Sequence, residues 1–318
     1  MSNVITLLLG IVGGVLLYFG ADFLIKGGVG IAKKLRIPSL IIGLTMMAFG
    51  TSAPELTVSI ASALQSKGDI SVGNVLGSNI CNLALILGLC AIVKPLPVNK
   101  LVIKSDMPVM LIATLAFAAF LGLTNGIPRW GGIVFVLMMA AYIITLFINS
   151  KRDEEMKEAI TGEVSDDEVN IIRAIFEFAG GLAALVYGAK LFVSGAVCAA
   201  KLANVPEAII ALTVVAIGTS LPELAASMIA TIKGENDIAV GNIVGSNIWN
   251  ILCIMGVSPI VNPIKLQNIS WVDMGVMLFV TLLAVPFFLT GRKLSRAEGA
   301  VWLLLYLGYL GYLVATQV

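Results

Sequence analysis

Two acidic residues lie in apolar stretches that are otherwise typical of membrane-spanning helices. Glu55 ends the segment GTSAPE, which begins at Gly50, and Glu223 ends the segment GTSLPE, which begins at Gly218. A charged residue at the centre of a membrane helix costs roughly 2.5 to 3.5 kcal/mol. Two of them in equivalent contexts, one in each half of the chain, predict a functional site that uses their charge.

A proline precedes each glutamate and disturbs the helix around it. Pro54 has no backbone N–H, so the carbonyl of Gly50 loses its helical partner, and the proline ring opens the preceding turn. In lipid, irregular backbone is tolerated where it is buried in protein or lines a water-filled cavity. Pro222 acts on Gly218 in the same way. Both segments therefore predict bent helices with loosened carbonyls beside a carboxylate.

Hydroxyl side chains also precede each glutamate. Thr51 and Ser52 stand four and three residues before Glu55, so they project to the same side of the kinked helix. Thr219 and Ser220 occupy the same positions in the second segment. One face of each bent helix is therefore expected to carry oxygen atoms.

The alternative interpretation of Glu55 is a packing kink in which the carboxylate pairs with a base or reaches toward the membrane surface. Lys190 is the one intramembrane base in the sequence that could serve. It has no basic equivalent in the first half, where Asp22 occupies the matching position. The duplicated pattern favours the functional interpretation.

A second motif brings further oxygen atoms into the apolar segments. It reads GNVLGSNICN from Gly73 and GNIVGSNIWN from Gly241. Its serine and last asparagine are four residues apart and share a helical face. Cavity lining is favoured for them over the alternative, hydrogen bonding between helices; these residues are Ser78, Asn82, Ser246 and Asn250. The remaining asparagines of the motif, Asn74, Asn79, Asn242 and Asn247, are predicted to lie on other faces. Its glycines are expected to serve close helix packing.

The oxygen chemistry points to hard cations. The sequence contains no histidine, which argues against a dedicated zinc or copper site. Calcium takes 6 to 8 oxygen ligands in flexible geometry. Two carboxylates would neutralise one divalent ion or balance a small set of monovalent ions. We therefore expect a site at which calcium and sodium compete, with no cofactor and, in the absence of a nucleophile–base pair, no enzyme activity.

Composition identifies an all-α polytopic membrane protein. The 318 residues are 58% hydrophobic and only 12% charged, and the mean hydropathy is +1.00. Basic and acidic residues nearly cancel, 20 against 19, and no surface for nucleic acid is evident. The four cysteines have no paired spacing and indicate small apolar residues. Membrane lipid is the expected partner, and no obligate protein partner is evident.

Ten membrane-spanning helices are predicted from the apolar blocks, five on each side of a polar linker. The first looks like a retained span, since a basic n-region and a cleavage site are missing. The ten ranges are 4–25, 38–65, 70–93, 106–124, 128–149, 171–198, 206–232, 238–261, 271–290 and 297–316.

The two halves form an internal repeat at a constant offset, without a gap over the motif segments. Polar positions match in register, as at Asp69 with Asp237 and Asn82 with Asn250. Residues 1–149 form the first five-helix repeat, with its motif core at about 43–88, and residues 171–318 form the second, with its core at about 211–256. An odd number of spans per half makes the second half enter the membrane from the opposite side, which predicts two inverted repeats.

Loop charges predict the orientation of the chain. Fifteen of the 20 basic residues fall beside the loops that follow odd-numbered spans. The positive-inside rule then places these loops in the cytoplasm and both termini outside. The linker, residues 150–170, holds eight acids and three bases and is expected to be a solvated cytoplasmic tether.

At the two GTSxPE segments and the two GN(V/I)(L/V)GSNI segments, the sequence resembles the cation/calcium antiporter superfamily, and within it the prokaryotic sodium/calcium exchangers. The resemblance covers roughly the whole chain. It implies exchange of sodium for calcium across the cell membrane by alternating access, with Glu55 and Glu223 as central shared ligands and with the first and sixth spans sliding as a gate. It further implies ligands from the carbonyls of Thr51, Thr219, Ala48 and Ala216 and from the side chains of Ser52, Ser220, Ser78, Ser246, Asn82 and Asn250.

The chain departs from some members of this superfamily at one point. These members carry an aspartate at one of the positions that match Asn82 and Asn250, whereas this chain has asparagine at both. The difference removes one titratable group, on which the proton competition and potassium dependence of those members would bear. The GTSxPE pattern differs from that of the proton-coupled vacuolar exchangers, which favours sodium as the driving ion. A proton-coupled calcium exchanger, a passive cation channel and a sodium-coupled symporter for an organic solute stay open as alternatives.

Overall fold

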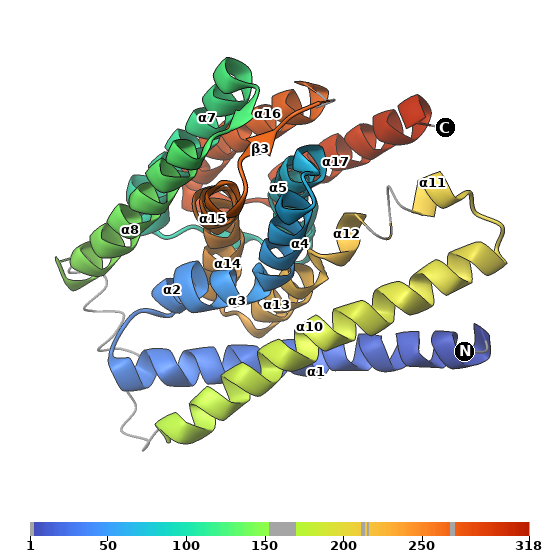
Figure 1. The fold of residues 1–318 in the computed structure, drawn as a ribbon. Coiled ribbons are helices and arrows are strands. Elements are labelled where there is room, and N and C mark those ends of the chain that lie inside the picture. Colours follow the sequence, from blue (N-terminus) through green and yellow to red (C-terminus); the bar gives the residue numbers. More distant parts are fainter. Residues whose placement is uncertain (1–2, 153–169, 211–213, 215, 268–270, 318) are drawn as a thin grey trace.

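The computed structural model describes residues 3–152, 170–210, 214, 216–267 and 271–317, which are largely helical (Figure 1). The predicted linker falls almost entirely outside the described residues. The first half consists of α1 (Asn3–Leu35), α2 (Ser39–Ile42), the π-helix η1 (Gly43–Met47), α3 (Ala48–Thr51), α4 (Ala53–Leu64), α5 (Gly68–Ile80), the π-helix η2 (Cys81–Leu87), α6 (Gly88–Val93), β1 (Leu96–Pro97), the π-helix η3 (Val102–Asp106), α7 (Met107–Thr124), β2 (Gly126–Ile127) and α8 (Arg129–Arg152).

The second half repeats this order. It consists of α10 (Ile171–Leu202), α11 (Glu207–Ile210), α12 (Ala216–Gly218), α13 (Leu221–Lys233), α14 (Asn236–Trp249), the π-helix η5 (Asn250–Ile254), α15 (Met255–Val261), β3 (Ile264–Lys265), α16 (Trp271–Leu289), the 3-10 helix η6 (Thr290–Arg292), β4 (Lys293–Leu294) and α17 (Arg296–Gln317).

Nine of the ten predicted spans correspond to helices that can cross a membrane. Among the described residues, eight helices are long and apolar enough, and the bent pair Ser39–Thr51 and Ala53–Leu64 makes a ninth. The tenth prediction, 206–232, includes residues outside the described part of the chain. The first predicted span was too short, because α1 continues to Leu35. Lysine is a good helix former, so Lys33 and Lys34 extend the helix, which ends shortly before Pro38. The chain is a multi-pass integral membrane protein.

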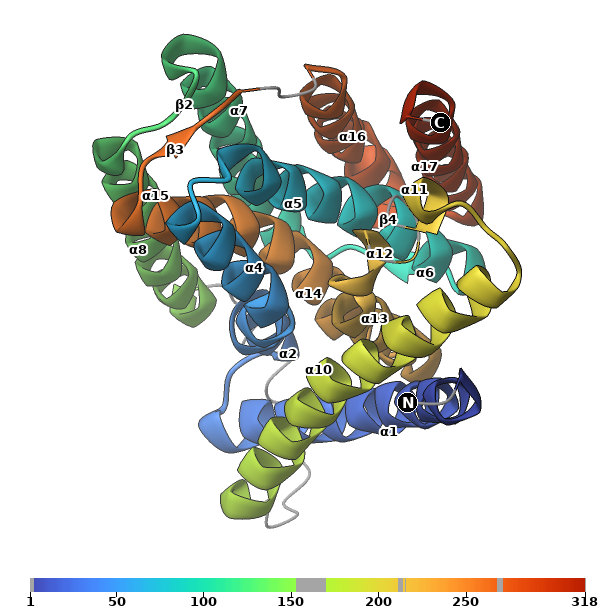
Figure 2. The ribbon, with the colours of Figure 1, turned by 45° about the vertical axis from the view of Figure 1, so that its right-hand side comes forward.

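Helices α1 and α10 lie side by side along one flank of the molecule (Figures 1 and 2). Glycines let their backbones approach closely. A Cβ atom added at Gly27 would lie 2.3 Å from the backbone nitrogen of Phe178, and one at Gly181 would lie 2.4 Å from that of Leu24. The glycine-rich sequence of both helices is therefore explained by their mutual packing.

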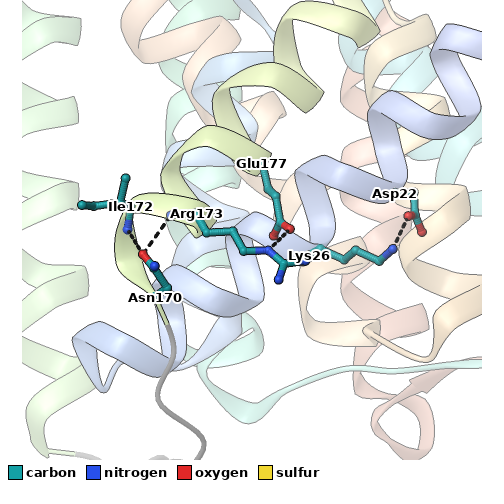
Figure 3. A network of polar contacts seen from close by, with 6 residues as sticks. All are labelled: Asp22, Lys26, Asn170, Ile172, Arg173 and Glu177. Atoms are coloured by element: carbon teal, nitrogen blue, oxygen red, sulfur yellow. Dashed lines mark hydrogen bonds and ion pairs between the residues drawn. The ribbon is translucent and has the colours of Figure 1, made fainter.

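Polar side chains form contacts along the halves of α1 and α10 that the loop charges predict to face the cytoplasm (Figure 3). Asn170 caps α10, because its side-chain oxygen accepts hydrogen bonds from the backbone nitrogens of Ile172 and Arg173 at 3.0 and 3.2 Å. On α1, Asp22 pairs with Lys26 over 2.7 Å. Asp22 also pairs with Lys233, the last residue of α13, which ties α1 to the second half.

The centre of the molecule is formed by two continuous spans, α5–η2–α6 and α14–η5–α15, which are the most buried of the candidate spans. Each packs against an outer helix of the opposite half, α6 against α17 and α15 against α8. The outer helices α7, α8, α16 and α17 thus enclose the centre on the side away from α1 and α10 (Figure 2).

Two short antiparallel sheets also join the halves. Strand β1 pairs with β4, with Leu96 opposite Leu294, and β2 pairs with β3, with Ile127 opposite Ile264. Each sheet connects loops that the sequence predicts to share one side of the membrane. Figure 1 shows the N- and C-terminal ends at one end of the molecule, and the end of α8 and the start of α10 at the other.

The repeat continues into the outer helices. Tyr142 donates a hydrogen bond to Asp106 over 2.9 Å, and Tyr309 donates one to Asp273 over 2.8 Å. The offset between these two pairs is shorter by one position than the offset between the motif segments. The internal repeat is therefore longer than the motif segments in which the sequence revealed it.

Candidate cation site

Both GTSxPE segments break the helix at their serine. Ser52 leaves the helical conformation between α3 and α4, with φ −81° and ψ 6°, and the two helices meet at 45°. Ser220 does the same before α13, with φ −88° and ψ 7°. Pro54 and Pro222 stand at the second position of the new helix, where the missing N–H has no intrahelical partner to lose. The predicted bend is confirmed in the first half, and the second half has the same break.

Each serine at a break bonds to the glutamate of the other half. Ser52 Oγ donates to Glu223 Oε1 over 3.1 Å, and Ser220 Oγ donates to Glu55 Oε1 over 3.3 Å. Both glutamates are only 1% exposed. These two bonds bring the predicted central carboxylates to one place, although they come from opposite halves of the chain.

The second oxygen of each carboxylate is left without a hydrogen bond. No described residue donates to Oε2 of Glu55 or of Glu223, and the same holds for Ser246 Oγ and for Oδ1 of Asn82 and Asn250. Leaving a buried polar atom unpaired costs about 1–3 kcal/mol, and more for a charged group. These five are among ten buried side-chain atoms without a partner in the described part of the chain, and they are the ones that belong to residues predicted as ligands. These oxygen atoms are the kind of ligand that hard cations such as calcium prefer.

The alternative interpretation, in which Glu55 pairs with a base or reaches toward the membrane surface, is wrong. Within the described part of the chain, no ion pair includes either glutamate, and their burial excludes a carboxylate that reaches toward the membrane surface. The described residues also contain no cluster of three or more His, Cys, Asp or Glu side chains. A cation here would be held by two carboxylates and neutral oxygens.

Asn74 and Asn242 support the two bent helices, a role that the sequence analysis missed. Asn74 donates to Ser59 Oγ over 3.0 Å and to the backbone carbonyl of Glu55 over 3.2 Å. Asn242 donates to Ser227 Oγ, also over 3.0 Å. Asn74 and Asn242 follow the glycines that begin the two copies of the second motif and occupy equivalent positions. This match between the halves could have pointed to their shared role.

The remaining predicted ligands lie around the two breaks. Thr51 is buried, and its hydroxyl lies 3.0 Å from the carbonyl of Met47 and 3.2 Å from Oδ1 of Asn242. The carbonyl of Ala48 accepts from the backbone nitrogen of Ser52 over 3.1 Å, and in the second half the backbone nitrogen of Ser220 donates to the carbonyl of Ile217 over 3.0 Å. The two breaks therefore differ in their local hydrogen bonds. Ser78 is buried on α5.

Four asparagines meet at the contact between α5–η2 and α14–η5. Asn82 Nδ2 donates to Asn247 Oδ1, and Asn250 Nδ2 donates to Asn79 Oδ1, both over 3.0 Å. The side chains of Asn79 and Asn247 each donate to the other's backbone carbonyl, over 3.5 and 3.4 Å. The sequence analysis did not predict that Asn79 and Asn247 bond to the two predicted ligands Asn250 and Asn82.

A cavity of about 450 Å³ opens beside the second break. It lies between α4 and α10 and extends to the start of α13, with Pro54, Thr57, Lys190, Thr219 and Pro222 among its lining residues. Thr219, a predicted ligand, therefore borders this cavity. Lys190 lines its wall and does not pair with Glu55.

Comparisons with known proteins agree over nearly the full length of the chain. The family model for sodium/calcium exchanger protein matches residues 5–148 and again residues 173–315. The chain is 37% identical to the putative antiporter CaxA of Alkalimonas amylolytica over 94% of this chain and 95% of that protein. It is 34% identical to the sodium/calcium exchanger MaX1 of Methanosarcina acetivorans over 97% of each. A solved structure of the sodium-calcium exchanger NCX_Mj, soaked with Na⁺ and Ca²⁺, is similar with a TM-score of 0.81 and 30% identity over 98% of each chain.

Proposed function

The chain belongs to the sodium/calcium exchanger family, and from this we propose that it exchanges sodium for calcium across the membrane at a site built on Glu55 and Glu223. The family is one of transporters and not of enzymes. Sodium and calcium are therefore the cargo of the protein and not resident cofactors. The same proposal makes it a cell-membrane protein with both termini outside and residues 150–170 in the cytoplasm.

The carrying observation is that the two buried carboxylates, each bonded to the serine of the opposite break, both keep one oxygen without a hydrogen-bond partner. Calcium is coordinated by 6 to 8 oxygens at about 2.3–2.6 Å, and in this proposal these two oxygens and those of Ser246, Asn82 and Asn250 supply five of them. Two carboxylates balance one calcium ion or two sodium ions, so the two cargoes compete for the same charge. The proposed ligands are Glu55, Glu223, Ser52, Ser220, Ser78, Ser246, Asn82 and Asn250 through side chains, and Thr51, Thr219, Ala48 and Ala216 through carbonyls.

Reciprocal contacts support two inverted repeats of five spans each. Ser52 bonds to Glu223 while its equivalent Ser220 bonds to Glu55, as a two-fold axis between the halves would produce. The pairing of β1 with β4 and of β2 with β3 is reciprocal in the same way. The family model also matches once in each half.

An asymmetry between equivalent contacts supports alternating access. Helix α1 packs against α13, and Asp22 closes that contact through its ion pair with Lys233. The equivalent contact would join α10 to α4, but the 450 Å³ cavity lies between them. Exchanging the two arrangements would open a path to the site between α1 and α13 and close the one between α10 and α4. The loop charges place the closed α1–α13 contact on the cytoplasmic side and the open cavity on the outside.

Calcium uptake into proteoliposomes tests the function. We expect uptake of radioactive calcium when sodium is trapped inside, and none without a sodium gradient. Glu55→Gln and Glu223→Gln should each abolish exchange while the purified protein stays folded, because each removes one of the two charges that balance calcium. Glu207→Gln is the matched control, since Glu207 is exposed and pairs only with Lys201 among the described residues.

The same assay separates the alternatives. Uptake driven equally well by a proton gradient would indicate the proton-coupled exchanger. Single-channel conductance steps, with calcium flux that does not depend on counter-transport, would indicate a channel. Near-normal flux from either glutamine variant would refute the shared central site.

A further inference from the structure

Asn79 and Asn247 are not among the proposed ligands, yet they are buried between the two halves beside them. We propose that they are positioning residues that determine which end of the Asn82 and Asn250 carboxamides faces the cation. They turn the two amide groups so that the oxygen is presented and the NH2 group is held away. This inference rests on the proposed function, because it concerns the same site.

A backbone carbonyl sets the direction of the hydrogen bonds that link Asn79, Asn247 and Asn82. The carbonyl of Asn79 can only accept, so the group of Asn247 that faces it at 3.4 Å must be its NH2. Asn247 Oδ1 then points the other way, where it can only accept. It lies 3.0 Å from the end of the Asn82 side chain, which must therefore be the NH2 group of Asn82. Asn82 Oδ1 is left free.

The same argument applies to the hydrogen bonds that link Asn247, Asn79 and Asn250. The backbone carbonyl of Asn247 accepts from Asn79 Nδ2 at 3.5 Å, and Asn79 Oδ1 accepts from Asn250 Nδ2 at 3.0 Å. Asn250 Oδ1 is left free in turn. Reversing any one amide would place two acceptors or two donors against each other, so the orientation of each set of linked amides is fixed as a whole.

The free oxygens belong to elements that contact the carboxylate-bearing helices. The π-helix η2, which contains Asn82, packs against α13, which carries Glu223. The π-helix η5, which contains Asn250, packs against α4, which carries Glu55. Both Oδ1 atoms are buried, and no described residue donates to them. A cation between the carboxylates is the partner that their chemistry fits.

An inverted amide would change cation binding in a charge-dependent way. A carbonyl oxygen attracts a cation and an NH2 group repels it, and both energies scale with the charge of the ion. Losing the orientation should therefore weaken calcium more than sodium. On a logarithmic scale, we expect the loss for Ca²⁺ to be about twice the loss for Na⁺.

A double-mutant cycle tests the inference by equilibrium binding of Ca²⁺ to the purified full-length protein, with Na⁺ as competitor. Asn247→Ala should lower calcium affinity roughly tenfold, because the Asn82 oxygen is no longer held toward the cation. In the Asn82→Ala background it should change the affinity by less than about twofold, because the group that Asn247 orients is gone. A residue with a merely structural role would give additive effects.

The matched control is the cycle of Asn247→Ala with Asn250→Ala. The backbone carbonyl of residue 247 survives the substitution, so Asn79 keeps its anchor and Asn250 keeps its orientation. We therefore expect additive losses in this pair. If Asn247→Ala does not fold, the cycle of Asn79→Ala with Asn250→Ala tests the second set of linked amides, with Asn82→Ala as its control.

The outcomes distinguish this inference from the proposed function. Additive losses in the Asn247–Asn82 cycle, or equal logarithmic losses for Ca²⁺ and Na⁺, would overturn the positioning role while sodium-driven uptake by the wild type still stands. Calcium binding without sodium-driven uptake would overturn the proposed exchange, and the cycle could still be measured. A wild-type protein that binds no calcium would refute both.

Discussion

Ser52 donates a hydrogen bond to Oε1 of Glu223 over 3.1 Å, although the two residues belong to opposite halves of the sequence. The reciprocal bond runs from Ser220 to Glu55 over 3.3 Å. The helix break of each half therefore orients the carboxylate of the other half. A change at one break is transmitted directly to the opposite glutamate.

Replacing Ser52 with alanine removes the hydrogen bond to Glu223 and a hydroxyl oxygen beside the proposed cation. We expect the apparent affinity for calcium to fall roughly tenfold, because a hydrogen bond to a charged group contributes about 1.5–3 kcal/mol. Ser220→Ala should have a similar effect through Glu55. Sodium-driven uptake measured over a range of calcium concentrations gives the apparent affinity.

The control for the serine variants is Thr145→Ala on the outer helix α8. The Thr145 hydroxyl is exposed and donates to the carbonyl of Ala141 within its own helix over 2.8 Å. Its loss should leave calcium affinity unchanged. Unaltered affinity in both serine variants would contradict the role of the crossed hydrogen bonds.

Adjacent glycines on α10 should differ sharply in their tolerance of alanine. A Cβ at Gly181 would lie 2.4 Å from the backbone nitrogen of Leu24, whereas a Cβ at Gly180 meets no atom within 4 Å. Gly181→Ala should destabilise the protein by about 1–3 kcal/mol, since neither backbone can yield without separating α1 from α10. Gly180→Ala should be neutral or slightly stabilising, because alanine favours the helix.

Thermal unfolding of the purified glycine variants measures this difference. Gly13 and Gly14 on α1 provide a second matched pair. A Cβ at Gly13 would lie 2.4 Å from the backbone nitrogen of Phe192, whereas at Gly14 the nearest atom is a side-chain carbon of Phe192 at 3.7 Å. Equal melting temperatures within both pairs would show that α1 and α10 do not pack as described.

Lys233→Gln should loosen the contact between α1 and α13. The ion pair of Lys233 with Asp22 is partly exposed, with 32% and 18% of the side chains accessible, so its contribution is modest. We expect hydrogen exchange in the last turn of α13 to rise by roughly two- to fivefold, consistent with less than about 1 kcal/mol. Mass spectrometry of exchanged peptides measures the change.

The control for this variant is Arg173→Gln, which breaks the pair with Glu177 within α10 (Figure 3). That pair links no two helices, so exchange in α13 should stay as in the wild type. If Lys233 closes the cytoplasmic path, its loss should also raise the apparent calcium affinity measured from the cytoplasmic side. Identical exchange in the two variants would contradict the tether.

Much of the fold could be predicted because membrane spans are encoded locally. A run of about twenty apolar residues identifies a span without knowledge of its neighbours, so nine of the ten predicted ranges correspond to helices in the structure. The error at the end of α1 has a local cause too. The first predicted range stops just before Lys26, where the apolar block ends, but a helix continues through lysines and ends where Pro38 approaches.

The site residues stay a prediction, and the structure adds hydrogen-bond partners that the sequence did not reveal. The burial of Glu55 and Glu223 followed from their apolar surroundings and from the missing base. The faces of Asn79 and Asn247 were assigned from α-helical periodicity. The structure places Asn82 and Asn250 in the π-helices η2 and η5, where the hydrogen-bond spacing widens, so α-helical spacing does not predict how they lie relative to Asn79 and Asn247.

The sequence by itself determined the apolar spans, the two helix-breaking segments and the equivalence of positions in the two halves, because each depends on residue type and local spacing. Only the tertiary structure decided which serine bonds to which glutamate, which amide oxygens are left free, and which of two equivalent helix contacts is closed. Which one forms depends on long-range packing and on single differences such as Lys233, whose partner Asp22 is distant in the chain but adjacent in the fold.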